Sequence, residues 1–310
     1  MLKDLWAVAQ NVLTLFILIG VGAVCRRTRL LNEEAVKCCA SVVLYIATPC
    51  VILGSCMRAF DRALLTGFLT VVAGALVLHL LLIGAATLIF RDRDERRRRV
   101  LRFATVFSNA GYMAIPLQQA LLGEEGVFYC AAYLVVFNTA MWTYGARLMS
   151  GDPKALSAKR LAANPGIIAV VLGLLLFLLP IEVPDVLRDA VGHLGTLNTP
   201  LPMLIVGYYL AGTDLRAALR DRGCYLSMAF RLLLAPAAGL GLLLLCGVRG
   251  SVLTSMTICM STPTATATTM FAARHDGDTA LSVELVSLST LCSVLTMPVF
   301  IALAAQLGAR

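Results

Sequence analysis

The chain has 310 residues, of which 59% are hydrophobic and 14% charged, and its mean hydropathy is +0.84. A soluble domain carries about 25% charged residues, so this composition excludes an ordinary soluble protein. The formal net charge of +8 would suit a nucleic-acid partner, but the basic residues are distributed as in a membrane protein. We therefore predict an integral membrane protein with a lipid bilayer around it and no nucleic-acid partner.

Ten apolar stretches predict membrane-spanning helices, because a chain in hydrocarbon must satisfy its own backbone hydrogen bonds. Their expected ranges are 5–24, 38–57, 64–90, 100–121, 126–149, 164–181, 190–211, 224–246, 251–272 and 279–305. The period-two alternation of a membrane β-strand is absent from these stretches. We expect an all-α polytopic protein of about ten transmembrane helices.

The first stretch is followed by its basic residues, Arg26 and Arg27, so it is interpreted as a span and not as a cleaved signal. With the N-terminus outside the cytoplasm, nineteen Lys and Arg residues fall in predicted inner loops and six outside. This bias follows the positive-inside rule. It predicts a multi-pass protein of the cell membrane with both termini outside. The basic run 91–99 is interpreted as a topology signal, with anionic-lipid binding as the alternative.

Two pairs of similar sequence features indicate an internal repeat. Pro49 in Ala-Thr-Pro and Pro200 in Asn-Thr-Pro of the seventh helix lie 151 residues apart, as do Gly126 and Gly277 in two short acidic turns. Five spans per half would give the copies opposite orientation, as in many secondary transporters. The predicted parts are a first five-helix repeat at 1–150, a short cytoplasmic connector at 151–163 and an inverted five-helix repeat at 164–310.

The fourth and ninth predicted helices are each interrupted by a proline and several small polar residues. The interruptions read Ser-Asn-Ala-Gly-Tyr-Met-Ala-Ile-Pro at 108–116 and Ser-Thr-Pro-Thr-Ala-Thr-Ala-Thr-Thr at 261–269. Backbone groups freed by such breaks must be buried in protein or line an aqueous cavity. Half-helix N-termini would favour a carboxylate there, and freed carbonyls would instead favour a sodium ion.

Amides, hydroxyls and prolines near these breaks are the candidate ligand-binding groups. The predicted substrate-binding residues are Ser108, Asn109, Pro116, Asn138, Asn198, Thr262, Pro263, Thr264 and Thr266. An amide offers both donors and an acceptor, and a threonine hydroxyl can switch between these roles. The alternative is that small polar residues simply let helices pack closely.

Ionisable residues inside spans are functional candidates by default. The ion-coupling candidates are Glu284, early in the tenth helix, and the hydroxyl of Thr48 in the second. The alternative for Glu284 is a position facing water at the inner interface. We expect Arg231 to snorkel or to anchor the topology, with a counter-charge for an anion as the alternative. His79 is expected to pack with its nitrogens hydrogen-bonded.

The chain has no P-loop, no G-x-S-x-G and no H-E-x-x-H sequence, so we expect no enzyme and no ATP-driven pump. The ten cysteines form no C-x-x-C pair, and we expect neither a metal site nor a disulfide framework. No cofactor is expected apart from Na⁺ or H⁺ as a coupling ion. Two other classes stay open: a membrane sensor that binds its ligand without transport, and an enzyme acting on lipid-linked substrates.

These residues resemble the auxin efflux carrier family, which includes bacterial malate permease-like members and plant auxin exporters. The resemblance covers essentially the whole chain and is clearest at 107–117, followed by Gly123. It recurs at Asn164-Pro165, at 199–203 with Gly207, and at Ser289-Thr290 with 296–298. The resemblance implies two inverted five-helix repeats, in which helices four and nine cross near the midplane. It also implies organic anions such as malate or indole-3-acetate as substrates.

The chain departs from the plant members in two ways: it has no long loop between the halves, and its ninth helix is richer in threonine. From the inverted repeat and the family resemblance together, we expect a secondary transporter that moves a mono- or dicarboxylate by alternating access. Its expected partners are the anion and the bilayer, and the sequence leaves a homodimer open.

Overall fold

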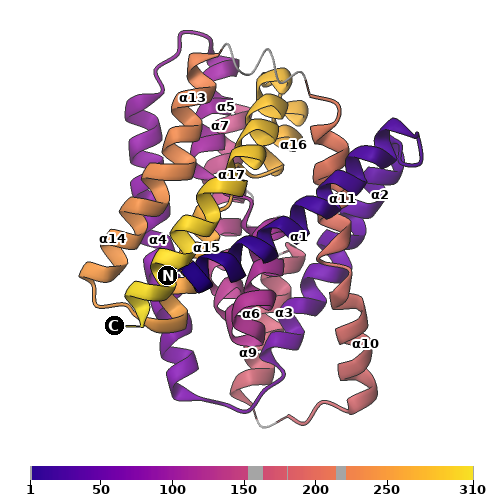
Figure 1. Ribbon diagram of the computed structural model, residues 1–310, viewed down its shortest axis with the longest axis vertical. Helices are drawn as coiled ribbons and strands as arrows, with labels where there is room; N and C mark the ends of the chain where they lie inside the picture. Colours follow the sequence, from indigo (N-terminus) through magenta and orange to yellow (C-terminus); the bar gives the residue numbers. More distant parts are fainter. Residues whose placement is uncertain (1, 153–162, 180, 214–220, 310) are drawn as a thin grey trace.

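A computed structural model describes residues 2–152, 163–179, 181–213 and 221–309, and every regular element in these ranges is a helix (Figure 1). The predicted all-α class is confirmed for this part of the chain. The predicted connector at 151–163 falls mostly on residues 153–162, which lie outside the described residues.

The chain begins with three long helical segments. They are α1 (Leu2–Arg27), then α2 (Glu33–Val42), the π-helical turn η1 (Val43–Ala47) and α3 (Thr48–Cys56) in one continuous run, and finally α4 (Arg62–Ile89). Asn32 caps α2 by accepting a hydrogen bond from the amide of Ala35, and Asp61 caps α4 through Ala63. Such caps satisfy amides that a helix start leaves unpaired.

The next segments contain a break and a sharp bend. They are α5 (Glu95–Val106), the π-helical turn η2 (Ala110–Ala114), α6 (Ile115–Ala140), the π-helical turn η3 (Met141–Gly145) and α7 (Ala146–Ser150). Within α6, Gly123 has φ +63° and divides the helix in two. A side chain disfavours this left-handed conformation, so glycine suits the bend. The bend separates the predicted fourth and fifth helices.

The second half of the chain has a comparable run of helices. They are α9 (Pro165–Leu178), α10 (Asp185–Thr196), α11 (Pro200–Leu210), α13 (Arg222–Ala229), the π-helical turn η5 (Phe230–Leu234), α14 (Ala235–Leu245), α15 (Gly250–Ser261), α16 (Ala267–Arg274) and α17 (Thr279–Gly308).

Each of the ten predicted spans overlaps a helix in the described ranges, but within these ranges only six helical runs are individually long and apolar enough to cross a membrane. They are Val8–Arg27, Glu33–Cys56, Arg62–Ile89, Ala110–Ser150, Arg222–Leu245 and Thr279–Gly308. The breaks shorten the other segments, and Ala110–Ser150 joins two of the predicted spans across the bend. These helices support a multi-pass membrane protein, whereas the ten-span count and the inverted halves stay predictions.

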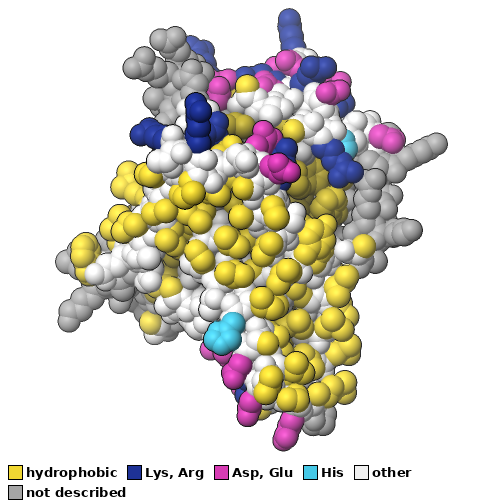
Figure 2. Space-filling model, turned by 90° about the vertical axis from the view of Figure 1, so that its right-hand side faces the viewer, with side chains coloured by type: hydrophobic (Ala, Val, Ile, Leu, Met, Phe, Trp, Pro, Cys, Tyr) yellow, Lys and Arg dark blue, Asp and Glu magenta, His cyan; other side chains and the backbone are white. Residues whose placement is uncertain are grey.

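The exterior carries large apolar side chains, as lipid contact requires. Figure 2 shows them covering the middle of the molecule, with Lys and Arg gathered mainly at the top. On α4, Leu69, Leu76, Leu80, Leu81 and Leu88 are all more than half exposed. Water-soluble monomers rarely expose apolar patches larger than a few hundred Å², so the pattern fits a bilayer.

Two glycines bring α1 and α11 unusually close together. A Cβ added to Gly22 would lie 2.3 Å from the carbonyl oxygen of Leu204, and one added to Gly207 would lie 1.9 Å from that of Ile19. Only glycine fits at either position, as in many close helix pairs within membranes. At the end of this pair, Arg26 donates to the carbonyl of Tyr208 at 2.9 Å.

Candidate functional site

The two interrupted helices break in different ways. Helix α15 ends at Thr262, which is extended (φ −64°, ψ 149°). The residue before a proline is disfavoured in the helical conformation, so Pro263 explains this break. Helix α5 ends at Phe107, also extended (φ −99°, ψ 117°), yet no proline adjoins it. Pro116 instead lies in the first turn of α6, where a proline is well tolerated.

The breaks meet in a short antiparallel contact. Ser108 and Thr264 face each other as an isolated β-bridge. The amide of Asn109 donates to the carbonyl of Pro263 at 2.7 Å, and the amide of Ala265 donates to Phe107 at 3.0 Å. We call this contact, made by residues 107–109 and 263–265, the crossing. Figure 1 shows α5 and α16 in the upper part of the molecule and α15 below them.

Two threonine hydroxyls of the ninth predicted helix, those of Thr262 and Thr264, bond to the protein backbone. The hydroxyl of Thr264 donates to the carbonyl of Ala104 at 3.3 Å. The backbone amide of Thr264 donates to Ser289 Oγ of α17 at 3.1 Å. The Thr262 hydroxyl donates to Cys259 at 2.9 Å. Thr266 forms the N-cap of α16 without a capping hydrogen bond from its side chain. The packing alternative therefore describes Thr262 and Thr264 well.

Other polar groups at the crossing are buried without a protein partner. Among the described residues, Asn109 Nδ2 at the crossing and Thr268 Oγ1 just beyond it have no hydrogen-bond partner, and Asn109 is 4% exposed. A buried unpaired polar group costs about 1–3 kcal/mol. Asn109 and Thr268 also lie at the starts of η2 and α16, where the helix dipole is positive. The crossing therefore offers donors to an anionic or polar ligand.

Arg231, on η5, does not snorkel. It is fully buried, and its guanidinium donates to the carbonyls of Thr105 at 3.4 Å and Val106 at 3.3 Å, as well as to that of Met260. The expectation of an interfacial position is wrong, because the residue faces the protein and finds acceptors at the ends of α5 and α15. The guanidinium therefore lies beside the crossing, at the helix ends that lead into it.

The remaining predicted residues make their described contacts elsewhere. Thr48 donates to Asn198 Oδ1 at 2.7 Å, so the two proline-linked repeat marks meet, and Asn198 Nδ2 has no described partner. Asn138 lies against the start of α9, where a Cβ on Gly166 would be 3.4 Å from its Nδ2. Glu284 is half-buried on α17 and interacts electrostatically with the thiol of Cys224 at the start of α13.

His79, on α4, has one of its two ring nitrogens paired. Its Nδ1 is 2.8 Å from the carbonyl of Ala75, whereas Nε2 has no partner among the described residues. The expectation that both nitrogens are hydrogen-bonded is therefore wrong for Nε2. The ring packs against Tyr133 and Phe107, with centroids 5.4 and 6.3 Å away.

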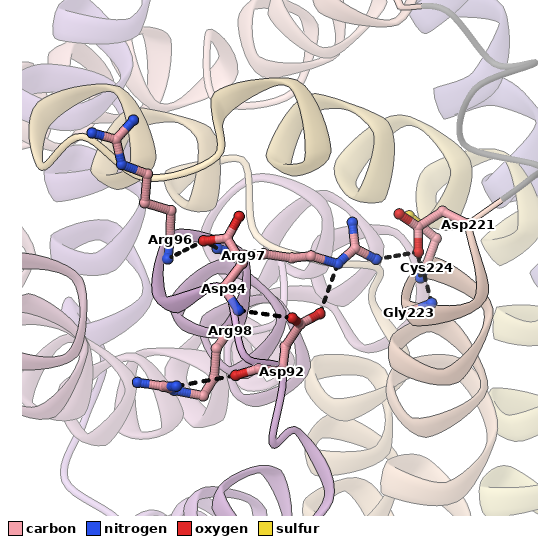
Figure 3. Close-up of polar contacts among 8 residues, drawn as sticks. All are labelled: Asp92, Asp94, Arg96, Arg97, Arg98, Asp221, Gly223 and Cys224. Atoms are coloured by element: carbon pink, nitrogen blue, oxygen red, sulfur yellow. Dashed lines mark hydrogen bonds and ion pairs between the residues drawn. The ribbon is translucent and has the colours of Figure 1, made fainter.

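Helices α5 and α13 are tied together on the way to the crossing. At their starts, Arg97 donates to Asp221 and, through Nε, to Asp92 at 2.9 Å (Figure 3). The hydrogen bond from Arg97 holds the pKa of the Asp221 carboxyl below its usual range. Further along, the hydroxyls of Thr105 and Ser227 lie 2.8 Å apart. These contacts align the last carbonyls of α5 with η5 and its arginine.

Sequence reasoning missed the partners that hold the crossing together. Ser289 was noted only within a family motif, and the Thr105–Ser227 pair carried no signal, since single hydroxyls are common in membrane helices. Arg231 did carry one, because an arginine inside a span must find a partner. Its sequence position alone does not say which partner.

Comparison with known proteins agrees with this architecture. The family model described as "Membrane transport protein" matches residues 7–160 and 154–301. An uncharacterised transporter of Methanocaldococcus jannaschii is 24% identical over 298 residues, covering 92% of this chain and 95% of that protein. One of Methanothermobacter thermautotrophicus is 24% identical over 301 residues, covering 94% and 96%. The resemblance to auxin efflux carrier-like transporters is confirmed, and the chain belongs to this membrane transport protein family.

Proposed function

We propose that this protein is a secondary transporter of a small organic anion, a mono- or dicarboxylate, and that the anion binds at the crossing. The observation that carries the proposal is Asn109 Nδ2, a buried donor without a partner among the described residues, at a helix start that meets a second broken helix. Membership of a transporter family accounts for transport, and the chemistry of the crossing accounts for the anion.

The charge around the crossing favours a carboxylate over a cation. Two helical segments, η2 and α16, begin there, and each helix N-terminus carries about half a positive charge. The charge of Arg231 is not counted here, because its guanidinium donates to carbonyls at the ends of α5 and α15. An amide donor and a hydroxyl, Asn109 Nδ2 and Ser108 Oγ, supply directional hydrogen bonds.

The proposed mechanism is alternating access between two inverted five-helix halves. Two contacts support it, because each joins corresponding parts of the halves: the crossing itself and the Thr48–Asn198 hydrogen bond. Related transporters with inverted repeats bind substrate at such a repeat interface. In this proposal, the helices that carry the crossing move relative to the others and open it to each side in turn.

Membrane energetics favours export of the anion. A potential of 100 mV, negative inside, drives each negative charge outward with about 2.3 kcal/mol. Export therefore needs no coupled ion, whereas accumulation of an anion inside would need one.

The test uses the purified protein with Asn109→Ala. Malate, succinate, lactate and indole-3-acetate are screened by thermal shift, and each carboxylate that stabilises the protein is then used in flux assays with liposomes. A ligand at 100 times its Kd stabilises by about 2.7 kcal/mol. We expect Asn109→Ala to lose this protection and the flux. The variant should still fold, because the amide of Asn109 donates to Pro263 and its carbonyl accepts from Met113, and alanine keeps both main-chain groups.

Gln118→Ala is the matched control. This buried amide on α6 donates to the carbonyl of Ser255 at 2.9 Å, so its loss lowers stability without removing a group of the crossing. Normal flux in Asn109→Ala would contradict the proposed site. Carboxylate protection without flux in the wild-type protein would favour the sensor, and no protection by any carboxylate would contradict the anion.

A further inference from the structure

The ends of α5 and α15 that meet at Arg231 form an unusual cluster of acceptors. The last four carbonyls of a helix lack partners within it. Here the carbonyls of Thr105 and Val106 close α5, and that of Met260 lies at the end of α15. All three accept hydrogen bonds from one guanidinium, which is fully buried.

We propose that Arg231 occupies a monovalent-cation site built from these carbonyls, so that its guanidinium replaces a bound ion and the crossing binds no Na⁺. Backbone carbonyl oxygens at the broken ends of membrane helices are the ligands that hold Na⁺ in transporters. In this chain, the same type of ligand set is taken by a side chain. The proposal does not depend on which substrate the protein carries.

The charges of the cluster balance. Each helix C-terminus carries about half a negative charge, and two of them converge, so their sum is about one negative charge. One guanidinium compensates this sum. A second cation beside Arg231 would meet a like charge and compete for the same oxygens, and therefore Na⁺ is excluded as long as the arginine is present.

The chain uses the same chemistry a second time, near its surface. Arg102 donates from Nε to the carbonyl of Phe90 and from a terminal nitrogen to that of Thr87, both at 3.0 Å. These carbonyls lie at the end of α4. Arg102 is only half-buried and meets a single helix end. Water can therefore solvate these carbonyls when the arginine is removed, and no cation is needed in its place. Arg102 is therefore a matched control.

The test measures the thermal stability of purified protein in detergent at constant ionic strength, with NaCl exchanged for choline chloride. We expect the wild-type melting temperature to be the same in both salts. Arg231→Ala should melt lower, and both Na⁺ and millimolar methylguanidinium should raise its melting temperature by about 5 °C in a saturable way. Arg102→Ala should show neither response.

Two results would overturn the proposal. One is saturable stabilisation of the wild-type protein by Na⁺ over choline, and the other is a folded Arg231→Ala variant that responds to neither cation. If Arg231→Ala cannot be recovered, the comparison of Arg231→Lys with Arg231→Gln decides. The lysine variant should stay close to the wild type, and equal losses in the two variants would also refute the role of the charge. Protection by carboxylates is measured in a separate experiment. If no carboxylate binds, the cation responses of these variants still decide the proposal about Arg231.

Discussion

The two ends of α5 each meet an arginine, and the two arginines are neutralised by different means. At the start, the half-exposed Arg97 donates to the carboxylates of Asp92 and Asp221. At the end, the fully buried Arg231 makes its described hydrogen bonds to backbone carbonyls alone. The first arrangement balances the charge with ionised carboxylates, whereas the second balances it with the partial charges of two helix ends.

The difference follows from the cost of burying charge. A carboxylate near water keeps part of its hydration, so the Arg97 pairs form cheaply and contribute little. In the interior, a carboxylate partner would itself have to be dehydrated, whereas the helix-end carbonyls are already there and need a donor. Broken helices thus create the acceptors that make a lone buried arginine tolerable.

The largest expected effect separates the two arginines directly. Arg231→Met should lower the free energy of unfolding by about 3 kcal/mol or more, because three buried carbonyls lose their donor. Arg97→Met should lower it by about 1 kcal/mol or less, as for other partly exposed pairs. Unfolding of both variants in mixed detergent micelles provides the measurement. Similar losses would contradict the contrast drawn here.

A smaller effect concerns the hydroxyl pair of Thr105 and Ser227, which joins α5 to α13. The Thr105 hydroxyl donates to the carbonyl of Leu101, so Ser227 must be the donor in the Thr105–Ser227 bond. Thr105→Val and Ser227→Ala should show a coupling energy of about 1 kcal/mol in a double-mutant cycle, because the bond is buried. Additive losses would show that the two hydroxyls do not depend on each other.

The smallest effect is the pH dependence of the Arg97–Asp221 pair. The pKa of Asp221 is lowered in the folded protein, mainly by the hydrogen bond from Arg97, so the pair stabilises the fold above the ordinary pKa of 3.8. This contribution is lost as the pH falls from there through the lowered value. Asp221→Asn keeps an N-cap oxygen for α13 but removes the charge.

We therefore expect the wild type and Asp221→Asn to differ by about 1 kcal/mol or less at pH 7, and to converge as the pH is lowered below 3.8. Melting temperatures of the two proteins across this range provide the measurement. A difference that grows towards acid pH would refute the sign of the pKa shift.

Much of the fold could be predicted because each helix leaves a local signal. Apolar length marked the segments, and Pro263 marked the break after α15. The break after α5 was predicted from a polar stretch that ends in Pro116, yet the chain leaves the helix at Phe107, well before that proline. Hydrogen bonds with the other broken helix hold this segment extended, and such a cause has no local signature.

The candidate site was only partly predictable for the same reason. Asn109 stood out because a buried amide beside a break is costly, and the structure puts it at the crossing. Asn138 has the same residue type but lies against α9. Arg231 was singled out as an ionisable residue within a span, but its burial and its carbonyl partners could not be foreseen from its own helix.

The sequence by itself determined that this protein is a helical membrane protein, which two of its helices are interrupted and which family it resembles. These features depend on hydropathy, on proline geometry and on short motifs, all of which act over a few neighbouring residues. Only the tertiary structure decided that the breaks pair with each other and that Arg231 lies between two helix ends. The paired breaks, and the contact of Arg231 with the end of α5, join residues more than a hundred positions apart, and the cost of burying a charge depends on acceptors supplied by other helices.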